Sequence, residues 1–97
     1  MTATRITPGS LDLVVVPGSA TYSCAANANA TVYVDFAVPA GYQLIIAWPQ
    51  AMGSSNVILR SFMRSSNTRW NFYIRNLGST ALSDITFQAR GLYAKVV

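Results

Sequence analysis

The sequence predicts an all-β protein, an antiparallel β-sandwich of jelly-roll-like type with about seven to eight short strands. Three observations support this prediction. Apolar and polar residues alternate in several short segments, and this two-residue period is typical of a half-buried strand. Turn residues separate the segments, as at Pro39-Ala40-Gly41 and Ser65-Ser66-Asn67. No segment repeats its apolar residues every ~3.6 positions over a useful length, so no helix is expected.

Two segments show the alternation most clearly, and we expect them to form the core together. In TVYVDFAV, residues 31–38, one face consists of Val32, Val34, Phe36 and Val38. In RWNFYIRN, residues 69–76, one face consists of Trp70, Phe72 and Ile74. Cys24 falls in a similar alternating pattern after Tyr22, so it is expected to be a small core residue. These faces are expected to pack against each other.

The run YQLIIAW, residues 42–48, is apolar on both faces. Strict alternation places Leu44, Ile46 and Trp48 on one side, and the other side is also apolar. A strand of this kind has to be covered on both sides. We therefore expect one side to be a contact between copies of the chain. The expected contact residues are Tyr42, Ile45, Ala47 and Trp48.

Four further strands are expected at residues 11–16, 20–24, 56–64 and 84–96. The turn dipeptide Pro17-Gly18 separates the first two. In the last strand, strict alternation would bury Lys95, so we expect a bulge near Gly91 that turns Tyr93 outward. Residues 1–10 are expected to form an N-terminal arm, and residues 11–97 a single sandwich domain.

The composition indicates a protein that associates with copies of itself. Hydrophobic residues make up 52% of the 97 residues, and charged residues only 10%. Such a chain has few charges with which to cover the outside of a monomer. We therefore expect part of its apolar surface to be buried between copies. The net charge of +4 favours anionic partners, although it results mainly from the small number of acids.

The residue types that most enzymes use for proton transfer are missing. The sequence has no histidine and no glutamate; its acids are Asp12, Asp35 and Asp84, and Cys24 is its one cysteine. Ser-His or Cys-His pairs, multi-cysteine zinc sites and internal disulfides therefore cannot be assembled. We expect no enzymatic activity, no catalytic residues, no cofactor and no bound metal.

The sequence also lacks targeting signals. No run approaches the ~18 apolar residues of a membrane span. The first ten residues have no apolar core of signal-peptide length. Synthesis and folding in a cytoplasm are therefore expected.

Four arginines are expected on the outer faces of strands: Arg60, Arg64, Arg75 and Arg90. Together with Tyr42 and Tyr73 they are the candidate binding residues for an anionic or saccharide partner. The alternative is an ordinary solvated face, or ion pairs with Asp35 and Asp84 across a subunit contact. A nucleic-acid partner is not expected, because proteins that bind single strands have a denser groove of basic and aromatic residues.

Three short motifs give the sequence a resemblance to a known family. They are the corner at Pro39, Gly41 and Tyr42, the turn at Arg75, Asn76, Ser79 and Thr80, and the pair Leu92 and Tyr93 in the last strand. Within residues 38–50 and 56–96, the sequence resembles the C-terminal head domains of bacteriophage tail-fibre and baseplate proteins.

The resemblance implies a role in a virus particle. It implies a β-sandwich that forms a homotrimer, is made in the host cytoplasm, and serves as a structural part of the virion beside other virion proteins. Such a part often contacts the host surface, including its saccharides. The heads of this family end long fibres, and this sequence has no shaft, so a capsid decoration or cement protein is an alternative. A stand-alone carbohydrate-binding module is a third possibility.

Overall fold

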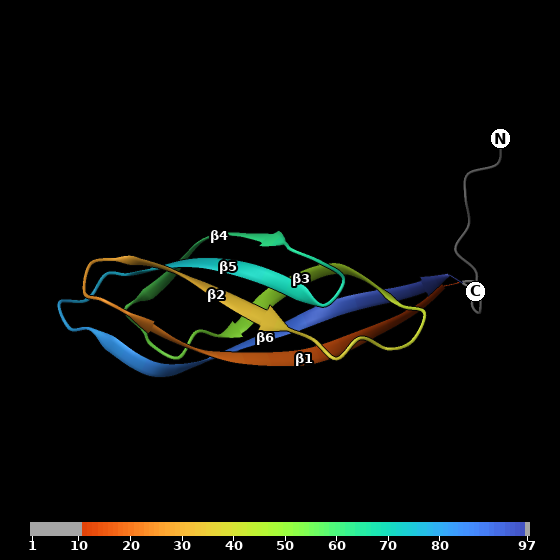
Figure 1. The fold of residues 1–97 in the computed structure, drawn as a ribbon, viewed down its shortest axis with the longest axis horizontal. Coiled ribbons are helices and arrows are strands. Elements are labelled where there is room, and N and C mark those ends of the chain that lie inside the picture. Colours follow the sequence, from red (N-terminus) through yellow and green to blue (C-terminus); the bar gives the residue numbers. More distant parts are fainter. Residues whose placement is uncertain (1–10, 97) are drawn as a thin grey trace.

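The structure, a computed structural model, describes residues 11–96, which form six β-strands in two sheets (Figure 1). The strands are β1 (Leu11–Cys24), β2 (Asn29–Asp35), β3 (Gln43–Ala51), β4 (Val57–Arg64), β5 (Arg69–Asn76) and β6 (Leu82–Val96). The strand orders are β1-β6-β3 and β2-β5-β4, and the two sheets lie one over the other. The N-terminal arm expected at residues 1–10 and the last residue, Val97, lie outside the described residues.

The predicted fold class is confirmed. The part of the chain that the structure describes is all-β, with two antiparallel sheets packed as a sandwich. The first strand pairs with the last, and the chain crosses to the other sheet after β1, β2, β3 and β5. This winding of the chain from sheet to sheet is jelly-roll-like. The expected number of strands is corrected from seven or eight to six within residues 11–96.

The lower strand count arises at Pro17-Gly18. These residues do not end a strand as expected but lie in the middle of β1, where Pro17 pairs with Arg90 and Gly18 with Ala89 of β6. β1 is an edge strand, and an edge tolerates proline because its missing N–H donor can face away from the ladder. The expected strands at residues 11–16 and 20–24 are therefore one strand of 14 residues.

Gly18 sets how closely β1 approaches the opposite sheet. A Cβ atom at this position would lie 2.7 Å from the ring of Phe36 and 2.8 Å from Cγ1 of Val34. Both distances are too short for non-bonded carbon atoms, so a larger residue would displace the core. The glycine is required here by packing and does not mark a turn.

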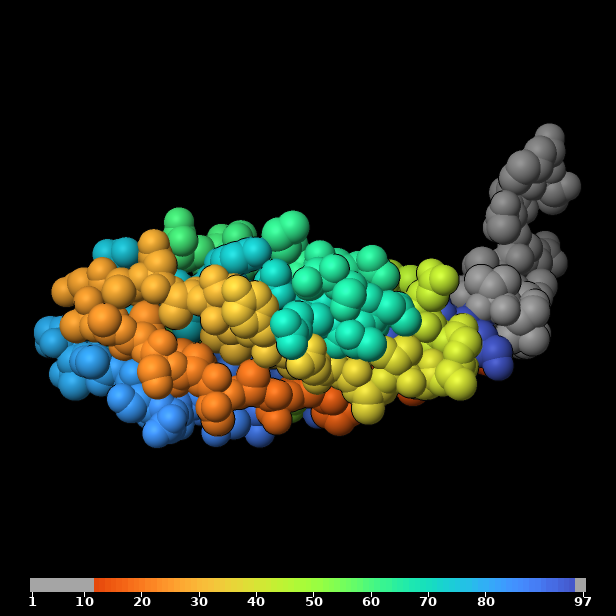
Figure 2. All heavy atoms as spheres, in the orientation of Figure 1, coloured from red at the N-terminus to blue at the C-terminus, as the bar shows by residue number. Residues whose placement is uncertain are grey.

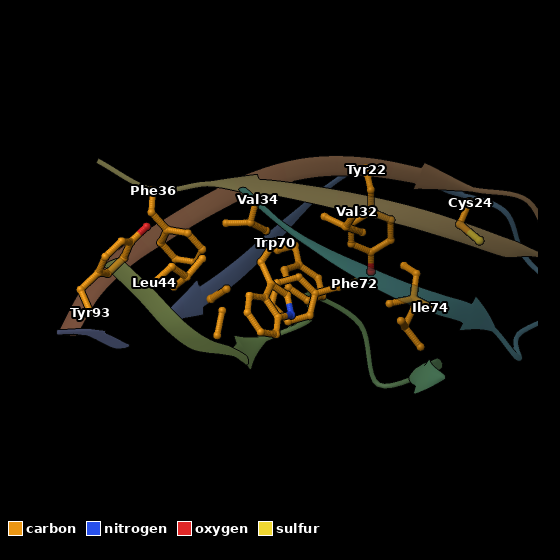
Figure 3. Packing of buried hydrophobic residues seen from close by; sticks show 14 residues of the cluster. Tyr22, Cys24, Val32, Val34, Phe36, Leu44, Trp70, Phe72, Ile74 and Tyr93 are labelled. Carbon is orange, nitrogen blue, oxygen red and sulfur yellow. The ribbon is translucent and has the colours of Figure 1, made fainter. Parts of the chain in front are cut away.

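The core lies between the two sheets, and the two most regular segments form it as predicted (Figure 3). Its fully buried residues include Val32, Val34, Phe72 and Ile74. Phe72 pairs with Val32 across the ladder, and its ring centroid lies 4.9 Å from that of Phe87 in β6. Cys24 is also buried, and its thiol lies 3.3 Å from the carbonyl oxygen of Ala28, to which it donates. The expected inward faces of β2 and β5 are therefore confirmed.

The end of β6 differs from the prediction. The ladder with β1 continues through Gly91 without a shift of register, so Tyr93 faces the core and is fully buried. Lys95 faces the same side but is only half-buried, at the end of the sandwich. Its ammonium lies 5.8 Å from the ring centroid of Tyr42, and its stem packs on Gly41. The prediction of a bulge near Gly91 is therefore wrong. No bulge is needed, because a lysine that faces inward at the end of the sheet keeps its charge near solvent.

Asn76 anchors the loops at one end of the sandwich. It is the last residue of β5 and is fully buried. Its amide nitrogen donates to the carbonyl oxygens of Ala25 and Thr80 at 3.3 and 2.9 Å, and its side-chain oxygen accepts from the Gly78 N–H at 2.9 Å. A buried amide with partners on both its atoms is stable, and it ties the β1–β2 loop to the β5–β6 loop.

Asn67 is a second asparagine whose side chain joins two segments through hydrogen bonds. It lies in the turn between β4 and β5, and its side chain accepts from the Leu44 N–H at 2.7 Å and donates to the Tyr42 carbonyl at 3.1 Å. Its own carbonyl accepts from the buried Tyr93 hydroxyl at 3.0 Å. Figure 2 shows this turn, in teal, beside the yellow segment that leads into β3. The turn therefore holds the start of β3 against the other sheet.

Replacement of Phe72 tests the register of β5. Phe72→Ala is expected to lower the free energy of unfolding by about 3–5 kcal/mol, because it leaves a cavity in the core. Denaturant unfolding followed by tryptophan fluorescence measures this change. Tyr33→Ala is the control, because it removes a ring of similar size that is 52% exposed, and it should cost much less. A Phe72→Ala variant as stable as the parent would show that the register is wrong.

Replacement of Gly18 tests the continuous β1 strand. Gly18→Ala is expected to destabilise the fold by about 1–3 kcal/mol, because the added methyl group overlaps Phe36 and Val34. The neighbouring exposed residue provides the control, since Ser19→Ala should change stability by less than ~0.5 kcal/mol. Thermal unfolding of both variants measures the difference. Equal stability of the two variants would mean that β1 does not pass over the core at this point.

Candidate interaction surfaces

The four candidate arginines do not share one face. Arg60 and Arg64 lie on β4 and Arg75 on β5, all in the β2-β5-β4 sheet. Arg90 lies on β6, in the other sheet. The four arginines, expected on the outer faces of strands as one set of binding residues, are therefore not brought together on one sheet. Their individual roles in binding stay predictions.

A bulge in β4 changes the faces of its last residues. The ladder with β5 shifts at Arg60, so that Phe62 pairs with Phe72 and Arg64 with Trp70. Cross-strand partners lie on the same face of a sheet. Arg64 therefore lies on the inner side of the sheet and not on the outer side as expected, and Phe62 lies on the same inner side. Phe62 stacks on Trp70 with 6.0 Å between ring centroids and stays 44% exposed on this edge strand.

The outer face of the β2-β5-β4 sheet is mainly polar, although Ile58 and Met63 of β4 are also exposed on it. Arg69 donates two hydrogen bonds to the carboxylate of Asp35, at 2.8 and 3.0 Å, and its guanidinium lies 5.5 Å from the ring centroid of Tyr33. This hydrogen bonding lowers the pKa of Asp35 below its ordinary value. Further along the sheet, Arg75 donates to the side chain of Asn29 at 3.2 Å. Asp35 is thus paired with Arg69 within the chain, whereas one alternative considered from the sequence was an ion pair across a subunit contact.

The two candidate tyrosines lie on different faces. Tyr73 is half-buried on the polar outer face, between Thr31 and Ser61 in the ladder. Tyr42 precedes β3 and packs against the core beneath Lys95. The structure therefore does not bring the two rings together into one binding site.

A bulge in β3 reassigns the faces of residues 42–48. The ladder with β6 shifts at Ile45, so Leu44 and Ala47 both face the core. Ile46 and Trp48 consequently face outward, and Ile45 is exposed at the bulge. Ala47 is completely buried, and its expected place in a subunit contact is therefore wrong. Ile45 and Trp48 remain accessible for such a contact.

The outer face of the β1-β6-β3 sheet has a continuous apolar surface. This apolar patch consists of Leu13, Val15, Ile46, Trp48 and Leu92. Leu92 in the central strand pairs with Val15 on one side and Ile46 on the other, which makes one apolar row across the sheet. Leu13 and Trp48 extend this row along the two edge strands on the same face. The apolar patch therefore spans all three strands.

The apolar patch is largely open to solvent. Its exposed fractions are 60% for Leu13, 44% for Val15, 40% for Ile46 and 36% for Trp48. These side chains together expose on the order of 400 Å², which is within the range of the largest apolar patch on a typical monomer. The largest apolar patch on a protein surface is often a functional one. The opposite outer face, with Asp35, Arg69 and Arg75, has a different chemical character.

Sequence reasoning identified one strand of this patch but missed β1. The signal was present, because five of the six residues in LDLVVV, residues 11–16, are apolar. A strand with apolar residues on both faces needs a cover on both. The same criterion that singled out residues 42–48 therefore also applies to Leu13 and Val15.

Residues 11–96 contain no group of three or more His, Cys, Asp or Glu side chains that could hold a metal ion. No helix in this part of the chain has the length and apolar character needed to cross a membrane. No protein-family model, curated protein or solved structure matches the chain.

Titration of Asp35 tests the ion pair. The pKa of its carboxyl is expected to lie below the ordinary aspartate value and to return towards it in Arg69→Gln, because the main cause of the shift is the hydrogen bond from Arg69. NMR observation of the carboxyl carbon over pH measures both. Arg75→Gln is the control, since Arg75 lies on the same face but binds Asn29.

The lowered pKa also sets the sign of the pH dependence. The contribution of this pair to stability is present above the ordinary aspartate pKa and is lost as the pH falls through the lowered one. The contribution is small because both side chains are exposed. An Asp35 pKa that does not change in Arg69→Gln would contradict the pairing.

Proposed function

We propose that this chain is a structural protein of a bacteriophage virion, a β-sandwich of a tail-fibre or baseplate appendage that assembles with copies of itself. The observation that supports assembly is the apolar patch on the β1-β6-β3 sheet. The motif resemblance supports the virion role and the homotrimer. In this role the protein acts by binding and not by catalysis.

The contrast between the two outer faces supports an assembly with a defined orientation. The apolar patch has no charged member, whereas the face of the β2-β5-β4 sheet includes Asp35, Arg69 and Arg75. In a cyclic trimer, the three patches meet around the axis and the three polar faces point to solvent. A stable interface covers about 800 Å² of each partner, so the patch forms its apolar centre and the flanking residues its rim.

A matched pair of charge substitutions tests the contact face. Ile46→Asp is expected to convert the assembled form to monomers, because a buried unpaired carboxylate at an interface is costly. Ile58→Asp is the control: Ile58 is 43% exposed, close to the 40% of Ile46, and also lies on an edge strand, but in the polar sheet. Sedimentation velocity at micromolar concentration measures the mass of each variant.

Each outcome of the sedimentation measurement either supports or contradicts the proposed contact. An assembled Ile58→Asp variant and a folded, monomeric Ile46→Asp variant support the proposed contact. A parent protein that sediments as a monomer, or an Ile46→Asp variant that assembles like the parent, would contradict it. Retention of the β-sheet circular dichroism spectrum shows that the variant has folded.

Labelling of virus particles tests the virion role. Antibodies raised against the purified chain are expected to label the tail appendage of the phage that encodes it. Labelling of the head would instead identify a capsid decoration or cement protein. Particles that bind the antibody nowhere would contradict a virion role and favour a stand-alone binding module.

A further inference from the structure

A hollow of about 460 Å³ lies on the outer face of the β1-β6-β3 sheet, beside the apolar patch. Its lining comes from all three strands and consists of Pro17, Gly18, Ser19, Gln50, Gln88, Ala89 and Arg90. The side chains of Pro17, Ser19, Gln88 and Arg90 face outward here, whereas the side-chain positions of Gly18 and Ala89 face the core. Its volume is within the range of about 300–1,000 Å³ that small-molecule sites occupy.

Arg90 is held in position at this hollow. Its Nε donates to the side-chain oxygen of Gln50 at 3.0 Å, and this hydrogen bond fixes the plane of the guanidinium. The terminal nitrogens of a guanidinium fixed in this way form a fork whose geometry matches a carboxylate. None of the residues that line the hollow is acidic, so the lining has a net positive charge. An anionic group is therefore the natural partner of Arg90.

The rest of the lining is suited to a sugar ring. Ser19, Gln50 and Gln88 provide hydroxyl and amide groups that both donate and accept hydrogen bonds, as sugar hydroxyls do. Pro17 provides an apolar wall. A pyranose has the complementary division into a polar rim and an apolar C–H face.

We infer that this hollow binds a saccharide unit that carries a carboxylate, of the hexuronic acid class. The carboxylate pairs with Arg90, the ring hydroxyls bind Gln50, Gln88 and Ser19, and the C–H face lies towards Pro17. A neutral sugar leaves Arg90 without its partner. A small bare anion leaves the amide groups without theirs, so the combination of both groups in one ligand determines the preference.

Titration of the full chain with three probes tests the ligand class. The probes are D-glucuronate, D-glucose as its neutral counterpart, and acetate as the carboxylate alone. Amide and tryptophan indole shifts in NMR spectra measure binding. Glucuronate is expected to bind at least about tenfold more tightly than either other probe. Equal affinity for glucose, or for acetate, would overturn the inference.

Two pairs of variants locate the site. Arg90→Gln is expected to weaken glucuronate binding about tenfold, whereas Arg75→Gln, which removes another half-buried arginine bonded to an amide side chain, should not. Ser19→Tyr fills the hollow from an exposed position and should abolish binding. Thr21→Tyr, two residues further on the same exposed face, is its control. Unchanged binding in folded Arg90→Gln or Ser19→Tyr would overturn the site.

The sugar site and the proposed assembly can fail separately. Ile46 does not line the hollow, so the monomeric Ile46→Asp variant is expected to bind glucuronate as the parent does. Loss of binding in that variant would show that a second copy completes the site, contrary to a hollow formed by one chain. A parent protein that assembles but does not bind glucuronate overturns this inference and leaves the proposed function intact.

Discussion

The antiparallel ladder between β1 and β6 is the interaction on which the rest of the structure depends. It runs from the pair Leu11 and Val96 to the pair Cys24 and Leu82, and it joins the first and last described strands along the whole sandwich. β6 also pairs with β3, so it is the central strand of its sheet. Phe87 and Tyr93 on its inner side are buried in the core. The outer side of the same ladder carries the apolar patch and the lining of the hollow. One pairing therefore aligns both the core and the surfaces proposed for assembly and binding.

The two-sheet architecture of the described residues leaves both outer faces uncovered. Two sheets of three strands can cover only one face of each other, and residues 11–96 contain no further layer over the outer faces. The exposed outer face of the β2-β5-β4 sheet carries side chains that water can solvate, namely Asp35, Arg69, Arg75 and two tyrosines. The β1-β6-β3 face has no comparable set of charges, and Arg90 lies at its border with the hollow. In the proposed assembly, association through that face completes the burial that the single chain cannot achieve.

Regular strands could be predicted from the sequence, and irregular ones could not. Residues 31–36 and 69–76 alternate without interruption, so their inward faces were correct. The faces of β3 and β4 were not, because the bulges at Ile45 and Arg60 shift the two-residue period and neither is a glycine or proline. Pro17-Gly18 has the composition of a turn, and only its edge position and the contacts of Gly18 show why a strand continues there. The hollow depends on the register of three strands that are far apart in the sequence, so no local pattern could indicate it.

Hydroxyl-radical footprinting of the assembled protein tests most directly whether copies cover the β1-β6-β3 face. Trp48 in the apolar patch and Met63 on the polar sheet are both reactive side chains, with exposed fractions of 36% and 54% in the single chain. The measurement compares their oxidation, by peptide mass spectrometry, in the assembled protein and in the Ile46→Asp variant. If copies cover this face, assembly protects Trp48 and leaves Met63 as reactive as before. Protection of Met63 with Trp48 fully reactive would contradict it, because the interface would then lie on the opposite face.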